Sequence, residues 1–346
     1  MPSTTINWDQ VSTHVTDKMI PRVRNNVFAS NVAWYRMKDK VEHYSGGRKI
    51  VYPLAFEAEG GGGQYWSGAD RIDIRHRNPI TAAEYYAINA VVPITVLQEE
   101  EDMVRGQEMV MPLVASKMKL ANRTAVSLLG GSDGLFSAGT NPKALAGLEA
   151  ALPDNPSSSH TYGGITCSST VNPWWRSQID ATDYNTGVAG TGNWVQGNNW
   201  RPFDQAWGTI GLNSDGLSPT LVLLNWGAFN DVSAACTKLD SSFRPQQDTN
   251  LRKAGFINIT YKNAVIVVDP SVPRNSSTKI EKAYFLNETS FNLVVHESRD
   301  FSFVPWRLAL DQFVRVAYIL WRGQLCFSER RCNLKMTDID TTLTMP

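Results

Sequence analysis

Residues 49–77 read KIVYPLAFEAEGGGGQYWSGADRIDIRHR, and the plan of the chain can be worked out from this stretch. Residues 49–59 are rich in strand-forming types, and apolar and charged residues alternate along 69–77, so both segments predict β-strands. Four consecutive glycines, 60–63, lie in the connection, which is long for a hairpin. Polar side chains fall on both faces of the pair, and such a ribbon has no core of its own. The stretch therefore predicts a two-stranded arm that must lie against something else.

A long helix is predicted downstream of the arm. Residues 84–97 favour β structure, and the four acids that follow suit the first turn of a helix, because the helix dipole favours anions there. Over 99–129 apolar residues recur at intervals of three and four. The pattern predicts a helix of about 25–30 residues, which at 1.5 Å per residue is roughly 40 Å long. Pro112 is expected to kink or break this helix, and Gly130 to end it.

The remaining segments differ in type and show no fixed repeat. Residues 131–218 are rich in Gly, Asn, Ser, Pro and Trp, and they predict mostly loops. A helix is predicted at 226–239, and strands at 219–225, 256–262, 264–269, 282–287, 291–297, 314–323 and 324–329. Two helices and eight or more strands indicate an α+β fold.

Charge and composition argue against several classes of protein. The chain has 346 residues, with 33 Lys and Arg against 33 Asp and Glu, so its formal net charge is zero. A dedicated nucleic-acid-binding protein carries a basic excess. A net charge near zero instead promotes association between copies. No apolar run approaches the roughly 18 residues of a membrane helix, and the first 18 residues lack the apolar centre of a secretory signal.

The sequence predicts no catalytic, cofactor-binding or metal-binding residue. GGSDG at 130–134 matches the string GxSxG, but that motif follows a strand and here a helix precedes it, so a glycine-rich helix stop is expected. No glycine-rich phosphate loop follows any predicted strand. The five histidines stand at no metal-ligand spacing, and the four cysteines form no CxxC pair. The chain is therefore not expected to be an enzyme.

Tryptophan is abundant, and five of the eleven lie between 174 and 207. One interpretation is a platform on which carbohydrate rings stack. The other is that the rings anchor long loops or lie at subunit interfaces, where aromatic residues are enriched. The basic string RRCNLK, 330–335, predicts a solvated face rather than a nucleic-acid patch.

The order of these segments resembles one family, the major capsid proteins of tailed bacteriophages with the Hong Kong 97 fold. The arm at 49–75 resembles the E-loop of that family, and the helix at 99–129 resembles its spine helix. TYGGITCSSTVNPWWRSQID, 161–180, resembles a stretch common in one large branch. The segments between 219 and 301 and the closing segment, 314–339, resemble its later strands in order.

The resemblance implies an α+β capsid fold with four parts. Residues 1–44 would form an N-terminal arm, and 45–80 would form the E-loop. Residues 81–130 together with 300–346 would form a peripheral domain that contains the spine helix. Residues 131–299 would form an axial domain near the five- and six-fold axes.

The resemblance also implies a function. The chain would assemble as pentamers and hexamers into the icosahedral head shell of a tailed bacteriophage, in the host cytoplasm, and enclose double-stranded DNA in the virion. The implied partners are further copies, the portal and a separate scaffold or decoration protein, since only about 45 residues precede the arm. No membrane or cofactor is implied. No lysine lies between Lys49 and Lys117, so the cross-linking that some relatives form from an E-loop lysine is not expected.

Candidate inter-subunit contacts lie at the arm tip and at the acidic start of the long helix. Glycine tolerates many backbone conformations, so the tip can change its angle between non-equivalent positions. Aromatic residues beside the tip are suited to anchor it in a neighbour. The candidates are Gly60, Gly63, Tyr65, Trp66, Arg71, Arg75, Glu99, Glu100 and Glu101.

Local charge adds a hypothesis about these contacts. Residues 1–50 hold eight bases and four acids, net +4, whereas 51–130 hold seven bases and ten acids, net −3. The N-terminal arm of one subunit would then lie across the acidic end of a neighbour's helix, where such pairs mainly steer association. The alternative is that the acids stabilise only their own helix.

Two other functions fit parts of the sequence. An encapsulin-like compartment would have the same fold and enclose enzymes instead of a genome. A Trp-rich carbohydrate-binding or carbohydrate-cleaving β protein belongs to a different class, and a cleaving enzyme would need two carboxylates facing each other across a cleft.

Overall fold

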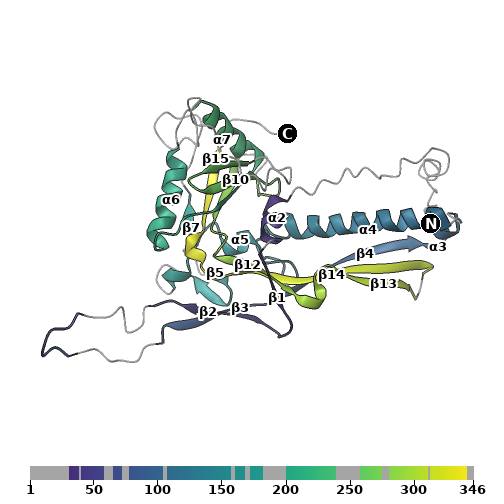
Figure 1. Ribbon diagram of the computed structural model, residues 1–346, viewed down its shortest axis with the longest axis horizontal. Helices are drawn as coiled ribbons and strands as arrows, with labels where there is room; N and C mark the ends of the chain where they lie inside the picture. Colours follow the sequence, from purple (N-terminus) through teal and green to yellow (C-terminus); the bar gives the residue numbers. More distant parts are fainter. Residues whose placement is uncertain are drawn as a thin grey trace.

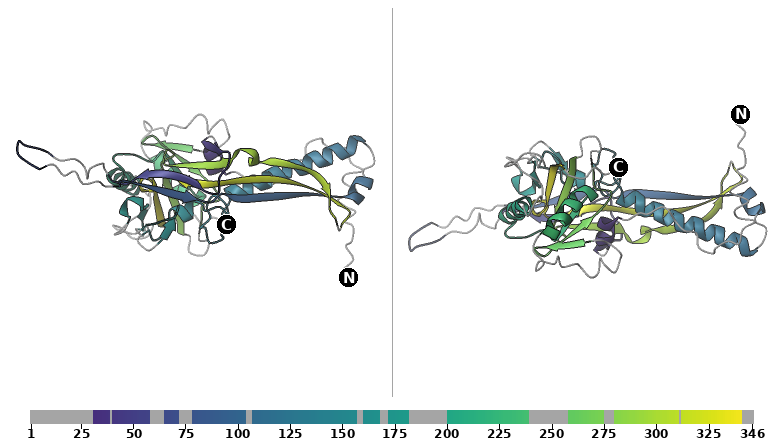
Figure 2. Two further views of the ribbon diagram at one scale, coloured as in Figure 1. Left: turned by 90° about the horizontal axis from the view of Figure 1, so that it is seen from below. Right: turned by 90° about the horizontal axis from the view of Figure 1, so that it is seen from above.

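The computed structural model describes residues 31–38, 40–57, 65–71, 78–103, 107–156, 160–167, 172–181, 200–238, 258–274, 280–310 and 312–340. In Figure 1 the elements form a central body from which two projections leave in opposite directions. One projection, which we call the arm, is the hairpin of β2 (Ile50–Ala55) and β3 (Ile80–Tyr85) with its loop. The other, the extension, consists of a long helix lying along part of a sheet. The two views of Figure 2 show the same opposed projections.

The extension is built around β14 (Val314–Phe327). Along one edge β14 pairs antiparallel with β4 (Ile88–Leu97). Along the other edge it pairs antiparallel with β13 (Ser302–Leu308) and then with β12 (Phe291–His296), which lies parallel to β1 (Val41–Tyr44). The sequence predicted two strands where β14 stands. There is one, because pairing with β12 carries the strand beyond its last pair with β4.

The helix α4 (Gln107–Gly130) covers one face of the extension, after a short helix α3 (Gln98–Met103). Ala121 and Ala125, one turn apart in α4, are buried with four strand residues, Val92, Ile94, Ala317 and Ile319. The predicted long helix is confirmed in place, although it consists of two helices. It does not break at Pro112, which lies inside α4, since packing against the sheet stabilises a helix beyond its local preferences.

A second sheet, of six strands, forms much of the central body. In spatial order its strands are β7 (Gln178–Asp180), β15 (Leu334–Asp340), β11 (Ile280–Leu286), β8 (Leu221–Leu224), β10 (Ala264–Val268) and β9 (Asn258–Tyr261). β8 and β10 run parallel, and all of their side chains are buried. Their uninterrupted apolar runs are typical of strands covered on both faces.

Two helices pack beside this sheet, α6 (Arg201–Asn213) and α7 (Trp226–Lys238). α7 was predicted. The prediction of mostly loops over 131–218 is wrong for α6, which buries Phe203, Ala206 and Ile210 at intervals of three and four. That spacing, with Pro202 in the first turn, was the available signal, and it was obscured by the glycines at 208 and 211.

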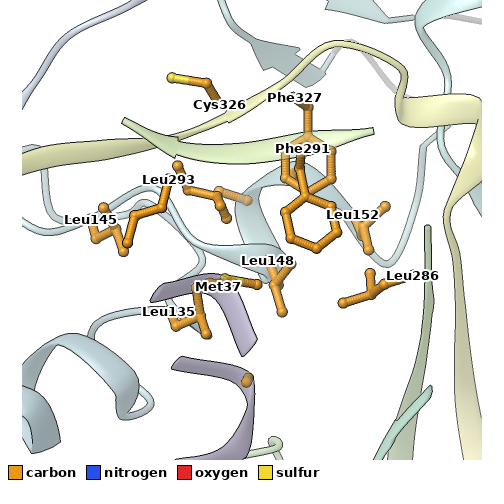
Figure 3. Close-up of a cluster of buried hydrophobic side chains, with 14 of the residues drawn as sticks. Met37, Leu135, Leu145, Leu148, Leu152, Leu286, Phe291, Leu293, Cys326 and Phe327 are labelled. Atoms are coloured by element: carbon orange, nitrogen blue, oxygen red, sulfur yellow. The ribbon is translucent and has the colours of Figure 1, made fainter. Parts of the chain in front are cut away.

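The junction between the two sheets holds the largest core. The helices α2 (Val32–Lys38) and α5 (Leu148–Ala151) lie there, and Figure 3 shows Met37, Leu148, Leu293 and Phe327 among the apolar side chains that converge from both sheets and both helices. Asp269 Oδ2 accepts a hydrogen bond of 3.0 Å from Ala33 N and so caps the first turn of α2. The core and this cap join the extension to the body.

The arm differs from its prediction in one strand. β2 pairs antiparallel with β3, from Ile50 opposite Tyr85 to Ala55 opposite Ile80. The sequence predicted the returning strand at 69–77, but residues 69–71 are not in a strand, and 72–77 lie outside the described residues. The strand forms from 80 onward because there it buries Ala83 and Tyr85 against the body.

Short elements complete the body beside the arm. They are the hairpin of β5 (His160–Tyr162) and β6 (Ile165–Cys167) and the 3₁₀ helices η2 (Pro173–Trp175), η3 (Glu297–Arg299) and η4 (Arg330–Cys332).

Candidate functional site

The root of the arm is fastened to the central body by hydrogen bonds. Tyr85 Oη donates to Phe327 O at 2.8 Å and accepts from Phe327 N at 3.2 Å. Glu84 N donates to Gly163 O at 2.8 Å, at the turn between β5 and β6. Gly163 has a φ of 61°, and a side chain there would meet the Tyr85 ring at 3.0 Å, so only glycine lets this turn touch the arm.

The arm also exposes several apolar side chains, although Leu54 of β2 is buried in the core. The ring of Phe56, directly after β2, stacks on Trp174 of the body with centroids 5.4 Å apart. Val51 and Ile80 are 53% and 60% exposed. Tyr65 is fully exposed and Trp66 is 59% exposed. An arm with this surface has little apolar contact of its own beyond its root.

The predicted anchors lie in a local turn. Trp66 Nε1 donates to Asp70 O at 3.1 Å, and Asp70 Oδ2 accepts from Ser67 N at 3.2 Å, so the turn is held by its own hydrogen bonds. Arg71 beside it is exposed. The other arm candidates, Gly60, Gly63 and Arg75, lie outside the described residues.

The extension has one covered and one uncovered face. Side chains alternate along a strand, and the buried residues of β4 are Val92, Ile94 and Val96. The residues between them face away from α4, and among these Val91 and Leu97 are 51% and 49% exposed. Within the described part of the chain, helices pack along β4 only on the α4 side (Figure 1).

The uncovered face continues across the neighbouring strands. Tyr318 of β14 pairs with Pro93 of β4 and with Val304 of β13, so the three side chains share this face. Tyr318 is 37% exposed, and beyond it the β13–β14 loop exposes Leu310 and Phe313, at 103% and 80%. Exposed apolar side chains that continue across neighbouring strands make this face a candidate interaction site.

The acidic candidates lie where β4 passes into α3. Glu100 Oε2 accepts from Lys117 Nζ at 2.5 Å, and the same ammonium group donates to Thr95 O at 3.2 Å. Glu99 is exposed, and Glu101 belongs to α3 with a side chain outside the described residues. Glu100 therefore stabilises its own chain, whereas Glu99 remains available to another molecule.

The basic string at 330–335 is not the solvated face that its sequence predicted. Arg330 and Lys335 are fully buried. Arg330 Nε donates to Ala151 O at 2.9 Å, and its guanidinium lies 5.1 Å and 5.5 Å from the ring centroids of Tyr162 and Trp175. A buried cation needs such partners, and these come from segments distant in sequence.

Lys335 belongs to an ionic network that runs from its own buried side chain to the exposed Asp154. Its Nζ lies 3.1 Å from Glu149 Oε2 and 2.6 Å from Asp154 Oδ1, and Lys282 pairs with the same two carboxylates. Burial opposes ionisation of Asp154, but the two ammonium groups outweigh it and hold the pKa of Asp154 below its usual value. The network fastens the segment around α5 to β11 and β15.

The grouped tryptophans pack inward where they are described. Trp175 is 1% exposed, and its Nε1 donates to Tyr162 O at 3.0 Å. Trp174, Trp200 and Trp207 are half-buried against the two main cores, and Trp194 lies outside the described residues. This arrangement favours the interpretation that the rings anchor loops over the interpretation of a carbohydrate platform.

The described residues offer little chemistry. No three of their His, Cys, Asp and Glu side chains gather as a ligand set, and none of their helices has the length and apolar character that a bilayer crossing requires. Burial raises the pKa of Cys326, and burial with a hydrogen bond to Glu329 raises that of Cys332 to about 12, so neither thiol ionises near neutral pH. The surfaces, rather than a cleft, are the candidate functional site.

No protein-family model and no curated protein matches the chain. Solved structures do match. The capsid asymmetric unit of cyanophage A-1(L) has a TM-score of 0.66 at 17% identity, over 96% of this chain and 98% of that one. The capsid of an empty GTA particle has a TM-score of 0.58 at 10% identity, over 95% and 97%. The SrpI encapsulin complex from Synechococcus elongatus PCC 7942 has 0.52 at 10% identity, over 99% and 98%.

These matches span nearly the full length of both chains, so the whole architecture is shared rather than one motif. The architecture includes the long helix on its sheet, the opposed two-stranded arm and the second mixed sheet between them. The chain therefore has the Hong Kong 97-like α+β fold of tailed-bacteriophage capsid proteins.

Proposed function

We propose that the chain is the major capsid protein of a tailed bacteriophage, which assembles into the icosahedral head shell around double-stranded DNA. One observation carries the proposal: the molecule exposes apolar surface on both of its opposed projections. The arm exposes Val51, Trp66 and Ile80, and the extension exposes Val91 and Leu97 on its uncovered face. The full-length match to phage capsid structures supports the same conclusion.

The two surfaces suit a head-to-tail contact. The arm of one copy would lie on the uncovered face of the extension of the next, so that each copy is donor and acceptor. A contact between two different patches of the same molecule is heterologous, and it generates closed rings when the rotation between copies closes. Pentamers and hexamers of one chain are such rings.

The parts implied by the sequence have roles in this arrangement. Residues 1–44 are the N-terminal arm and 45–80 the E-loop; 81–130 with 300–346 form the peripheral domain, and 131–299 the axial domain. The proposed partners are further copies, a portal, a separate scaffold or decoration protein, and the enclosed DNA. The protein would assemble in the host cytoplasm and reside in the virion, without enzymatic activity.

The test is the size of the purified protein. Gel filtration and negative-stain microscopy are expected to show rings or megadalton shells rather than the 38.4 kDa monomer. A protein that stays monomeric at every concentration and salt would contradict the proposal. A monomer would instead favour the carbohydrate-binding alternative, which requires no assembly.

An encapsulin-like compartment is the second candidate, because an encapsulin shares the fold over nearly the full chain. The contents of particles isolated from their native source decide between the two functions. Nuclease-resistant DNA of genome length supports a capsid, whereas a packaged protein without DNA supports a compartment.

A further inference from the structure

A stretch of α4 departs from the charge balance of the chain. Residues 109–132 contain no acid but three bases, Lys117, Lys119 and Arg123, although acids and bases are equal in number, 33 each, over the whole chain. The helix therefore carries a locally uncompensated positive charge unless acids from elsewhere lie against it.

Among the described residues, only one of the three cations has an ion-pair partner. Lys117 turns toward the sheet, where it binds Glu100 and the carbonyl of Thr95. Lys119 stands two residues further, about 200° around the helix, and is exposed. Arg123 follows one turn later on the same side and is exposed too. Among the described residues neither Lys119 nor Arg123 forms an ion pair.

Exposed leucines flank these cations. Leu120 and Leu128 are 47% and 46% exposed, two turns apart on α4. Thr124 lies between them, and its hydroxyl donates a hydrogen bond of 3.0 Å to Leu120 O within the helix. We call Lys119, Leu120 and Arg123, which lie on the side of α4 away from the buried Ala121 and Ala125, the outer strip of α4. An apolar line bordered by charges is the usual composition of a protein–protein contact, whereas DNA phosphates would make no use of the leucines.

The chain itself carries the complementary segment. Four consecutive acids, Glu99 to Asp102, lie in α3, and Glu99 is exposed. Glu100 is committed to Lys117 on the sheet side of α4. Lys119 and Arg123 lie roughly 200° and 240° around α4 from Lys117, and among the described residues no ion pair joins either of them to α3.

We infer that the outer strip of α4 receives the acidic helix α3 of a second copy. The inference rests on the proposed self-assembly and names one of its contacts. An antiparallel pair of α4 helices about a two-fold axis places each α3 on the partner's strip, so the contact forms twice. The charge pairs steer association and set the register, while the leucines are buried between the helices.

Charge reversal with rescue tests the pairing. The first variant carries Lys119→Glu with Arg123→Glu, and the second carries Glu99→Lys with Glu101→Lys, which spares Glu100. Each is expected to slow assembly at least about 10-fold at 50 mM salt, measured by light scattering, and the effect shrinks at 500 mM because salt screens exposed charges. The quadruple variant, with both pairs reversed, is expected to assemble within about 3-fold of the wild type.

Controls separate the contact from folding. Lys143→Glu reverses another exposed cation and is expected to assemble as the wild type does. Circular dichroism and thermal melting establish that each variant is folded. Sedimentation velocity of the same samples detects the two-fold dimer directly, so a wild type that forms dimers but no shells refutes the proposed function and still supports this contact.

Three outcomes overturn the inference. The first is wild-type assembly and dimerisation by the Lys119→Glu, Arg123→Glu variant. The second is a loss in both double variants that the quadruple variant does not restore, which moves the partner of the acids elsewhere, for example to the basic N-terminal segment. The third is unchanged assembly together with a lost affinity for a 30-base-pair DNA probe, which makes the strip a nucleic-acid contact.

Discussion

The arm and the extension both leave the central body, yet they are stabilised differently. The extension carries its own cover, because α4 packs Ala121 and Ala125 onto the strands beneath it. Within the described residues the arm has no such cover beyond its root, and Ile80 and Trp66 are 60% and 59% exposed. The difference shows that a projection with an internal core is part of the fold, whereas a projection without one depends on another molecule. Substitutions in the extension should therefore lower the stability of the fold, whereas substitutions in the arm should reduce assembly.

The largest effect is expected in the covered part of the extension. Ile319, which is 4% exposed, packs under α4. Ile319→Ala leaves a cavity there and is expected to lower the free energy of unfolding by about 2–5 kcal/mol, measured by urea denaturation. Val51→Ala in the arm, at a position 53% exposed, is the matched control and should change it by less than about 0.5 kcal/mol. Equal losses in both variants would erase the distinction between the two projections.

At the arm tip the expected loss is in assembly rather than in folding. Truncating an aromatic anchor that is buried in a partner costs about 2 kcal/mol or more per contact. Trp66→Ala is therefore expected to give soluble, folded protein without particles by gel filtration and microscopy. Trp226→Ala removes another exposed tryptophan, 39% exposed and on α7, and should assemble normally. Particles at wild-type yield from Trp66→Ala would show that Trp66 is not an anchor of assembly.

The arm root should behave as part of the body. Tyr85 is 3% exposed, and its hydroxyl both donates to and accepts from Phe327. Tyr85→Phe leaves the Phe327 carbonyl and amide without these partners and is expected to destabilise folding by about 1–3 kcal/mol. Tyr65→Phe at the fully exposed tip is the control. A Tyr85→Phe variant with wild-type stability would show that the arm root, like the exposed tip, contributes little to the stability of the fold.

The smallest effect concerns pH at the hairpin that supports the root. His160 begins β5, and its Nε2 lies 2.7 Å from Ala150 O. Burial lowers the pKa of His160, the bond to Ala150 raises it, and the charges of Arg330 and Lys335 lower it further, so the folded value lies below the usual 6.5.

A base with a lowered folded pKa binds its proton more readily in the unfolded chain. Its contribution to stability is therefore complete above pH 6.5 and declines as the pH falls below it. The free energy of unfolding is expected to decrease from pH 7.5 to pH 6. His160→Gln keeps an N–H donor without titrating and should reduce this dependence. An identical pH dependence in the variant would exclude His160 as its source.

Helices and strands could be predicted where the pattern of apolar residues within one segment was sufficient to indicate them. The helix at 99–129 was found from its spacing of three and four, because α4 buries one continuous face against the sheet. The strands β8 and β10 were found because both of their faces are buried, which leaves an uninterrupted apolar run. The exposed anchors Tyr65 and Trp66 were also chosen from local sequence, and their exposure agrees with that choice, while their contacts stay a prediction.

Other elements depend on partners that the local sequence does not contain. The returning strand of the arm is β3 rather than 69–77, because the Tyr85 hydroxyl forms a hydrogen bond with Phe327, more than two hundred residues away in the sequence. The strands β1 and β15 were not predicted, and each pairs with a strand from a distant segment. The strand β13 was not predicted either, although its partner β14 is the next strand in the chain.

The sequence by itself determined the order of the elements, the long helix, the glycine-rich arm and the balance of charge, because these follow from periodicity and composition. Only the tertiary structure decided which faces remain uncovered and which charges are buried. Arg330 and Lys335 read as surface residues but lie inside, since Ala151 and Glu149 approach them only after folding. Lys119 and Arg123 read as ordinary helix residues, and only the fold places them on the side of α4 away from the sheet, where both are exposed.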